Sequence, residues 1–294
     1  MDVENIGQVR AECPDLLAGN ARMTATTDGG KLIDVDGLVL CAGEGVIVSH
    51  AGDYNLDQDP DPATPSGIWY AVFTEEPTTT GVISQATLAG LDHIVMLDNN
   101  TLIFARADDS HGNMTIINDG SFLQAAGLTG PKQLWFAPIT IHNIEGNAPN
   151  EYFEEDADNC IHINSASAFS VTYLNELDFT LQNPGQTSGA ITVSGGMPEF
   201  NDSDYTVTIT NMTKNAVVEL TSENGTEYHY ENLSEKYSYR LTITDGVECS
   251  SSTIINFLSG DPLEVHIPDT TTTPGAQICI PLTVKDFKDV GTFS

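Results

Sequence analysis

The fold is decided by residues 191–249, which open with Ile191-Thr-Val-Ser-Gly-Gly-Met-Pro198 and close with Tyr237-Ser-Tyr-Arg-Leu-Thr-Ile-Thr-Asp-Gly246, shortly before Cys249. Within the stretch, Tyr205–Thr210 also alternates apolar residues with threonine. A period of two places alternate side chains on a buried face and the others in water, which is typical of half-buried antiparallel strands. The stretch therefore predicts a small Ig-like β-sandwich of roughly 80 residues.

The order of motifs in this stretch is Val-x-Gly-Gly-x-Pro-x-aromatic, then Asn232-Leu233, then Tyr239-x-Leu-x-Ile-x-Asp-Gly and a nearby cysteine. This order resembles the SprB-type repeat of very large surface adhesins of Bacteroidota, which are exported by type IX secretion. The chain departs from the repeat where Val247-Glu248 separates the glycine from Cys249, and in a second strand that is rich in threonine rather than aromatic residues. The resemblance implies a secreted, extracellular protein at the cell surface, with one repeat over residues 177–260.

Upstream of the repeat, residues 1–37 are predicted to be a lead-in segment or the end of a preceding module, and residues 38–176 a β-rich module. Continuous apolar runs at Ile68–Phe73 and Leu134–Ile141 predict central strands covered on both faces. No stretch keeps a 3.6-residue period for three turns, so helix is expected to be minor. The module resembles uncharacterised modules that precede such repeats in surface proteins of Saprospira-like Bacteroidota.

Downstream, residues 261–294 contain two strand-like runs and then Lys285-Asp-Phe-Lys-Asp-Val290. This pattern resembles the start of a cohesin-like β-sandwich. A polar bridge at Glu176–Gly189 marks a candidate boundary before the repeat. We therefore expect an all-β chain of tandem β-sandwich (Ig-like) modules, the last one incomplete, cut from a longer polypeptide.

The chain is strongly acidic, with 42 Asp and Glu against 10 Lys and Arg and a net charge of −32. Such a field repels phosphate backbones, so no nucleic-acid partner is expected. No apolar run approaches the ~20 residues of a membrane-spanning helix, so no membrane span is expected in this segment. The charge favours solubility at high ionic strength and is suited to binding multivalent cations.

The five cysteines lie far apart and form no Cys-x-x-Cys, which argues against a structural zinc site. A disulfide between Cys41 and Cys160 is the preferred pairing, because both residues flank the same β-rich module. A Cys13–Cys41 bridge is the competing pairing. Sparse cysteines in a β protein are typical of an oxidising compartment.

No signature of a catalytic site is present: there is no Gly-x-Ser-x-Gly, His-Glu-x-x-His, Walker loop or dinucleotide-binding motif. We therefore predict that the chain is not an enzyme. His162 lies in an Ile-His-Ile alternation and is predicted to face outward from its strand.

One loop has a pattern of metal ligands, because oxygen-bearing side chains alternate at Asp53, Asn55, Asp57, Asp59 and Asp61. Calcium takes six to eight hard oxygen ligands, so this loop is a candidate calcium site. It is not an EF-hand, because Gln58 and Thr64 replace the glycine and glutamate of that loop. The alternative is an acidic loop in water. A second acidic cluster at residues 151–158 is a weaker candidate.

These observations predict a structural and adhesive segment of a large secreted cell-surface protein, used for surface adhesion, gliding or the capture of prey. It would form a stalk or filament that spaces and presents binding domains. The expected partners are other copies of the chain in a filament or ring, and cell-surface glycans or proteins. One alternative is a calcium-dependent carbohydrate- or protein-binding adhesin domain at residues 38–176. A second alternative is an accessory region of a secreted hydrolase.

Overall fold

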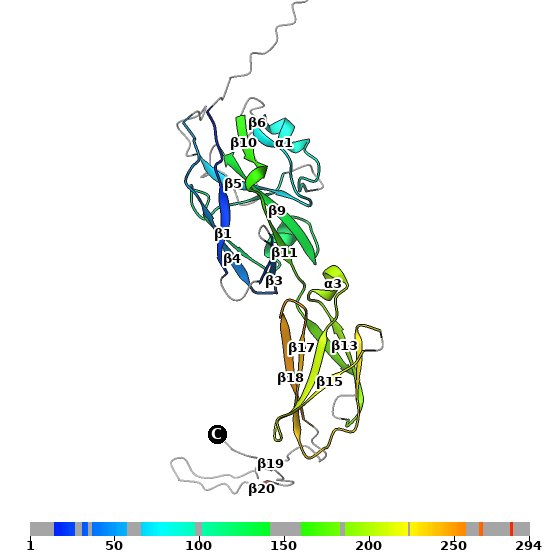
Figure 1. The fold of residues 1–294 in the computed structure, drawn as a ribbon. Helices are drawn as coiled ribbons and strands as arrows, with labels where there is room; N and C mark the ends of the chain where they lie inside the picture. The colour runs from blue at the N-terminus through cyan, green and yellow to red at the C-terminus, as the bar shows by residue number, and fades with distance from the viewer. Residues whose placement is uncertain are drawn as a thin grey trace, which may run out of the picture. The chain divides into compact units, whose positions relative to one another are not determined.

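The computed structural model describes residues 15–26, 31–34, 37–57, 66–97, 102–141, 160–182, 186–222, 224–256, 265–266 and 283–284. The chain forms two compact units (Figure 1). Unit 1 contains residues 1–178, 193–205 and 244–251, and unit 2 contains residues 179–192, 206–243 and 252–294. Strands dominate both units and the helices are short, so the prediction of an all-β chain with minor helix is confirmed. No helix in the described residues is long and apolar enough to cross a membrane.

The elements that begin in unit 1 are β1 (Ala21–Thr26), β2 (Lys31–Asp34), β3 (Gly37–Leu40), β4 (Gly45–His50), β5 (Gly67–Phe73), β6 (Thr80–Ser84), α1 (Gln85–Ala89), β7 (Phe104–Ala105), β8 (Met114–Ile117), α2 (Ser121–Ala125), β9 (Lys132–Ile141), β10 (Cys160–Asn164), η1 (Ser165–Ser167), β11 (Phe169–Tyr173), β12 (Asp178–Gln182), α3 (Pro198–Asn201) and β18 (Ser250–Asn256), of which β12 and β18 continue into unit 2. The candidate lead-in thus contributes β1 and β2, and β1 pairs antiparallel with β4.

The larger sheet of unit 1 has the order β2-β3-β11-β9-β10-β6, and β5 pairs with both β9 and β7. Every residue of β5 is buried, and β9 is buried from Phe136 to Ile141. This confirms the prediction that the two apolar runs form central strands. Their side chains share a core with the smaller sheet β1-β4-β8, to which Val48 of β4 and Met114 of β8 contribute.

Unit 2 is built from β13 (Gly189–Ser194), β14 (Thr206–Asn211), β15 (Ala216–Leu220), β16 (Glu227–Tyr230), β17 (Ser238–Thr244) and β18 (Ser250–Asn256), together with most of β12. One sheet has the order β12-β13-β16 and the other β15-β14-β17-β18. Val207, Ile209 and Leu241 are buried as the alternation predicted, while the threonines between them are more exposed. The segment interpreted as a polar bridge contains β12, because Asp178–Gln182 pairs with β13.

Of the predicted last module, the structure describes only β19 (Val265–His266) and β20 (Thr283–Val284), which pair antiparallel. The rest of residues 261–294 lies outside the described residues, as does the acidic cluster at residues 151–158.

The disulfide differs from the one predicted, because Cys41 is bonded to Cys249, with Cα atoms 5.6 Å apart. Cys41 directly follows β3, whereas Cys160 begins β10, and β11 and β9 lie between these strands. Neighbouring strands are about 4.8 Å apart, so three steps across the sheet place β3 and β10 roughly 14 Å apart. A disulfide spans only about 4.4–6.8 Å between Cα atoms, so the predicted Cys41–Cys160 bridge is wrong.

The loop that carries Cys249 is organised by the buried carboxylate of Asp245. Its Oδ1 accepts hydrogen bonds from the backbone N–H groups of Val247 and Cys249 at 3.0 and 2.9 Å. Its Oδ2 accepts one from the N–H of Met197 at 2.7 Å. A buried carboxylate needs such donors to compensate for its lost hydration, so Asp245 fixes the backbone from which the disulfide leaves.

Candidate functional site

The densest set of long-range polar contacts in the described part of unit 1 surrounds the segment Asp15–Ala21, here called the N-terminal strap. Leu16 and Ala18 of the strap are buried. Leu17 exchanges two backbone hydrogen bonds with Asn55, at 3.0 and 2.9 Å. The strap therefore lies against the loop that contains the first candidate calcium ligands.

His162 on β10 binds the strap from one side, because its Nδ1 accepts a hydrogen bond from the N–H of Ala18 at 3.1 Å. A nitrogen that accepts this bond carries no proton, so the ring is neutral with its proton on Nε2. The backbone N–H of His162 donates to Thr140 Oγ1 at 2.9 Å. Burial lowers the pKa of His162, since a charged ring would lose its hydration. The predicted outward orientation is wrong, because His162 is only 8% exposed.

His50, at the end of β4, binds the other backbone group of the same strap residue, the carbonyl of Ala18. Its Nε2 lies 2.7 Å from the carbonyl oxygen of Ala18, and a carbonyl only accepts, so Nε2 is the donor. Its Nδ1 accepts from the N–H of Gly52 at 3.0 Å. Both backbone groups of Ala18 are thus bound by imidazole rings from distant parts of the chain.

Two uncharged side chains, from the end of β10 and from η1, also hold the strap. Asn164 Nδ2 donates to the carbonyl of Gly19 at 2.6 Å. Ser167 Oγ accepts from the N–H of Ala21 at 2.8 Å and donates to its carbonyl at 3.0 Å. Gly19 has φ +69°, and a Cβ there would lie 2.5 Å from Asp53 Oδ1 and 2.9 Å from the backbone nitrogen of Tyr54. Only glycine fits so close an approach.

Asp53 is the first candidate calcium ligand, and its carboxylate binds the strap. It accepts from Asn20 N–H at 2.8 Å and from Asn20 Nδ2 at 2.6 Å. The backbone hydrogen bond from Asn20 is the main cause that lowers the pKa of Asp53, so the carboxylate stays charged. Asn55 Oδ1 accepts the N–H of Asp57 at 3.0 Å. Both side-chain groups are therefore occupied by bonds within the chain.

The other candidate ligands, Asp59 and Asp61, lie outside the described residues. Within the described ranges, no three His, Cys, Asp or Glu side chains are grouped so that they could hold a metal ion. The calcium site therefore stays a prediction.

Beside Asp53, the Tyr54 ring lies close to two imidazole rings. Tyr54 lies between His50 and His111, with ring centroids 5.6 and 6.1 Å away. Asp109 organises the turn of His111: its Oδ1 accepts the N–H of His111 at 2.9 Å and its Oδ2 accepts from Asn113 Nδ2 at 2.8 Å. Burial raises the pKa of Asp109, but the hydrogen bonds from Asn113 and His111 lower it by more. The net effect is a lowered pKa, so the carboxylate is charged.

Asn113 joins this turn to the end of β4, because its Oδ1 accepts the N–H of His50 at 3.1 Å. The resulting surface, formed by Tyr54, His111 and the carboxylates of Asp53 and Asp109, is here called the ring cluster. His111 and both carboxylates are exposed, and Tyr54 is half-buried. Aromatic faces beside ionised oxygens can stack against an apolar ligand face and accept hydrogen bonds from its hydroxyl or ammonium groups.

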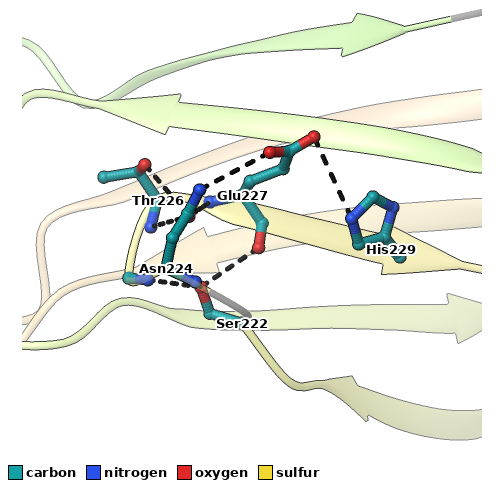
Figure 2. A network of polar contacts seen from close by, with 6 residues as sticks. Ser222, Asn224, Thr226, Glu227 and His229 are labelled. Atoms are coloured by element: carbon teal, nitrogen blue, oxygen red, sulfur yellow. Dashed lines mark hydrogen bonds and ion pairs between the residues drawn. The ribbon is translucent and has the colours of Figure 1, made fainter.

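A second polar network lies in unit 2, in the turn that leads into β16 (Figure 2). Asn224 Oδ1 accepts from the N–H groups of Thr226 and Glu227, at 3.2 and 2.8 Å. Ser222 Oγ accepts from Gly225 N–H at 2.7 Å and donates to the Glu227 carbonyl at 3.0 Å. These bonds replace those of a regular turn, so the network closes the loop and has a structural role.

No local pattern in the sequence indicated the strap contacts of His50 and His162, because each contact joins residues that are far apart in the chain. The only local signal for the ring cluster was the acidic loop at Asp53. Comparison of the chain with protein-family models gives no match, and comparison with curated proteins gives none either.

Proposed function

We propose that the chain is a structural and adhesive segment of a large secreted cell-surface protein, which forms a stalk or filament and presents binding domains. The all-β architecture in two units supports this proposal, together with a net charge of −32 that keeps an extended surface protein soluble. A disulfide is typical of proteins outside the cytosol. The proposal includes Ig-like modules related to the SprB-type repeat, with other copies of the chain as partners.

The observation that carries the proposal is the position of the Cys41–Cys249 bridge, whose cysteines are 208 residues apart in sequence. Tension applied to the two ends of the chain passes from β3 through the sulfur atoms to β18 and bypasses everything between them. The core strands β5 and β9 lie within the bypassed stretch. The bridge therefore protects most of the fold from extension, as a load-transmitting stalk requires.

Single-molecule stretching from the two ends tests this proposal. The 208-residue separation corresponds to roughly 690–750 Å of extended chain, at about 3.3–3.6 Å per residue. We expect the oxidised protein to extend without this length, and the extension to increase by this length when a reductant is present. The Cys41→Ala/Cys249→Ala variant should release it without reductant. Release of the full length from the oxidised wild type would refute the role of the bridge in transmitting force.

A second candidate function is glycan or protein binding at the ring cluster, with calcium bound at the adjoining loop. It is favoured by the position of Tyr54 and His111 beside two ionised carboxylates. Tyr54→Ala should abolish retention on immobilised polysaccharide, while Tyr237→Ala in unit 2 should not. Calcium should raise the melting temperature of unit 1, and EDTA should reverse the increase. Equal retention of both variants, or an unchanged melt, would remove this candidate.

A further inference from the structure

The N-terminal strap is fastened to β10 through an atom that can be protonated. Ala18 N–H donates to Nδ1 of His162, and both residues are buried. When an imidazole takes up a proton, Nδ1 becomes a donor. Two N–H groups would then face each other in a buried site, where an unpaired donor is costly.

We propose that His162 is an acid-sensitive latch: protonation of its ring releases the strap Asp15–Ala21 from β10 and exposes the buried side chains of Leu16 and Ala18. The proposal concerns unit 1 alone and does not depend on the stalk function. Release is local, because the core strands β5 and β9 do not depend on the strap for their pairing.

Among the described residues, the other ionisable groups around the strap are Asp15 on the strap itself, His50 at the end of β4 and Asp53 on the loop that follows. His50 has the same arrangement as His162, since Gly52 N–H donates to its Nδ1, so its protonation would also remove an acceptor. Attraction to His50 is one of the causes that lower the pKa of Asp53. For His162, burial is the cause that lowers the pKa.

The direction of the pH dependence follows from the lowered pKa of His162 in the closed state, in which the strap is bound to β10; in the open state the strap is released. In the open state the ring is hydrated and has an ordinary pKa of about 6.5, so the open state binds protons more tightly. Closure is therefore favoured above about pH 6.5 and is lost progressively as the pH falls below it. If the closed state does not bind the proton at all, the open fraction at pH ~5.5 should reach at most about tenfold its value at neutral pH.

Hydrogen exchange of the strap amides in the full chain tests the proposal, with each rate normalised to that of an unstructured peptide at the same pH. We expect the protection of Ala18 to fall by up to about tenfold between neutral pH and pH ~5.5. In His162→Asn, Oδ1 can accept the same bond without titrating, so protection should not depend on pH. His229→Asn in unit 2 is the matched control and should keep the wild-type response.

An NMR titration of the wild type gives a second measurement, in case His162→Asn does not fold. The ring of His162 and the amide of Ala18 should titrate with one shared midpoint, below the ordinary imidazole pKa of about 6.5. Protection of Ala18 that is independent of pH in the wild type would overturn the latch. So would a fall in protection that persists in His162→Asn, or separate midpoints for the ring and the amide.

Discussion

Removal of the Cys41–Cys249 bridge is the perturbation whose size follows most directly from the structure. The two cysteines are 208 residues apart, and in the chain-entropy model a closed loop of that length restricts the unfolded chain by about 5 kcal/mol. Measured effects commonly fall below the entropic value, so we expect Cys41→Ala/Cys249→Ala to lower the free energy of unfolding by about 2–5 kcal/mol.

Tryptophan fluorescence reports this change for unit 1 alone, because both tryptophans, Trp69 on β5 and Trp135 on β9, belong to that unit. With a urea m-value of about 2–3 kcal/mol per molar, the midpoint should fall by on the order of 1–2 M. The comparison is made without reductant, so that any other disulfide stays intact. An unchanged midpoint would refute the reasoning, and so would non-reducing peptide mapping that joins Cys41 to Cys13 or Cys160.

Three further predictions concern unit 1. Gly19→Ala should lower the urea midpoint much more than Gly52→Ala: both glycines have positive φ, but a Cβ at Gly19 overlaps its neighbours and one at Gly52 meets open space. Equal effects would contradict the crowding argument. Asn118→Ala should cost about 2–4 kcal/mol, because its buried amide donates to two backbone carbonyls, at 2.9 and 2.8 Å. Unit 1 should lose stability as the pH falls below about 6.5, because the pKa of His162 is lowered, and His162→Asn should flatten this slope in acid denaturation curves.

The strands were predictable because their signals are local. Alternation in residues 205–210 and 237–243 identified the buried face of β14 and β17, and the burial of Val207 and Leu241 follows it. The two long apolar runs identified β5 and β9 as strands covered on both faces. A side chain's place on a strand depends on its immediate neighbours in the sequence, so a single chain contains enough information for this step.

The long-range pairings were not predictable in the same way. Cys41 and Cys160 flank one module in sequence, but the order β3-β11-β9-β10 separates them in space. His162 was predicted to face outward because it alternates with buried isoleucines. That alternation is real, but the strap covers the second face of β10. The strap residue that contacts His162, Ala18, is 144 residues away from it in the sequence. Neither the order of a sheet nor the covering of its face is encoded in the periodicity of one strand.

The two features that the sequence concealed respond to different chemistry. The Cys41–Cys249 bridge opens with a reductant, whereas the contact of His162 with Ala18 opens with acid. Reduction leaves the protonation of His162 unchanged, and acid does not cleave a disulfide. The midpoint of strap release should therefore be the same in the oxidised protein and in Cys41→Ala/Cys249→Ala, even though the variant is less stable overall. If the two midpoints differed, the strap would open only through unfolding of the whole unit, and the latch would not be a local device.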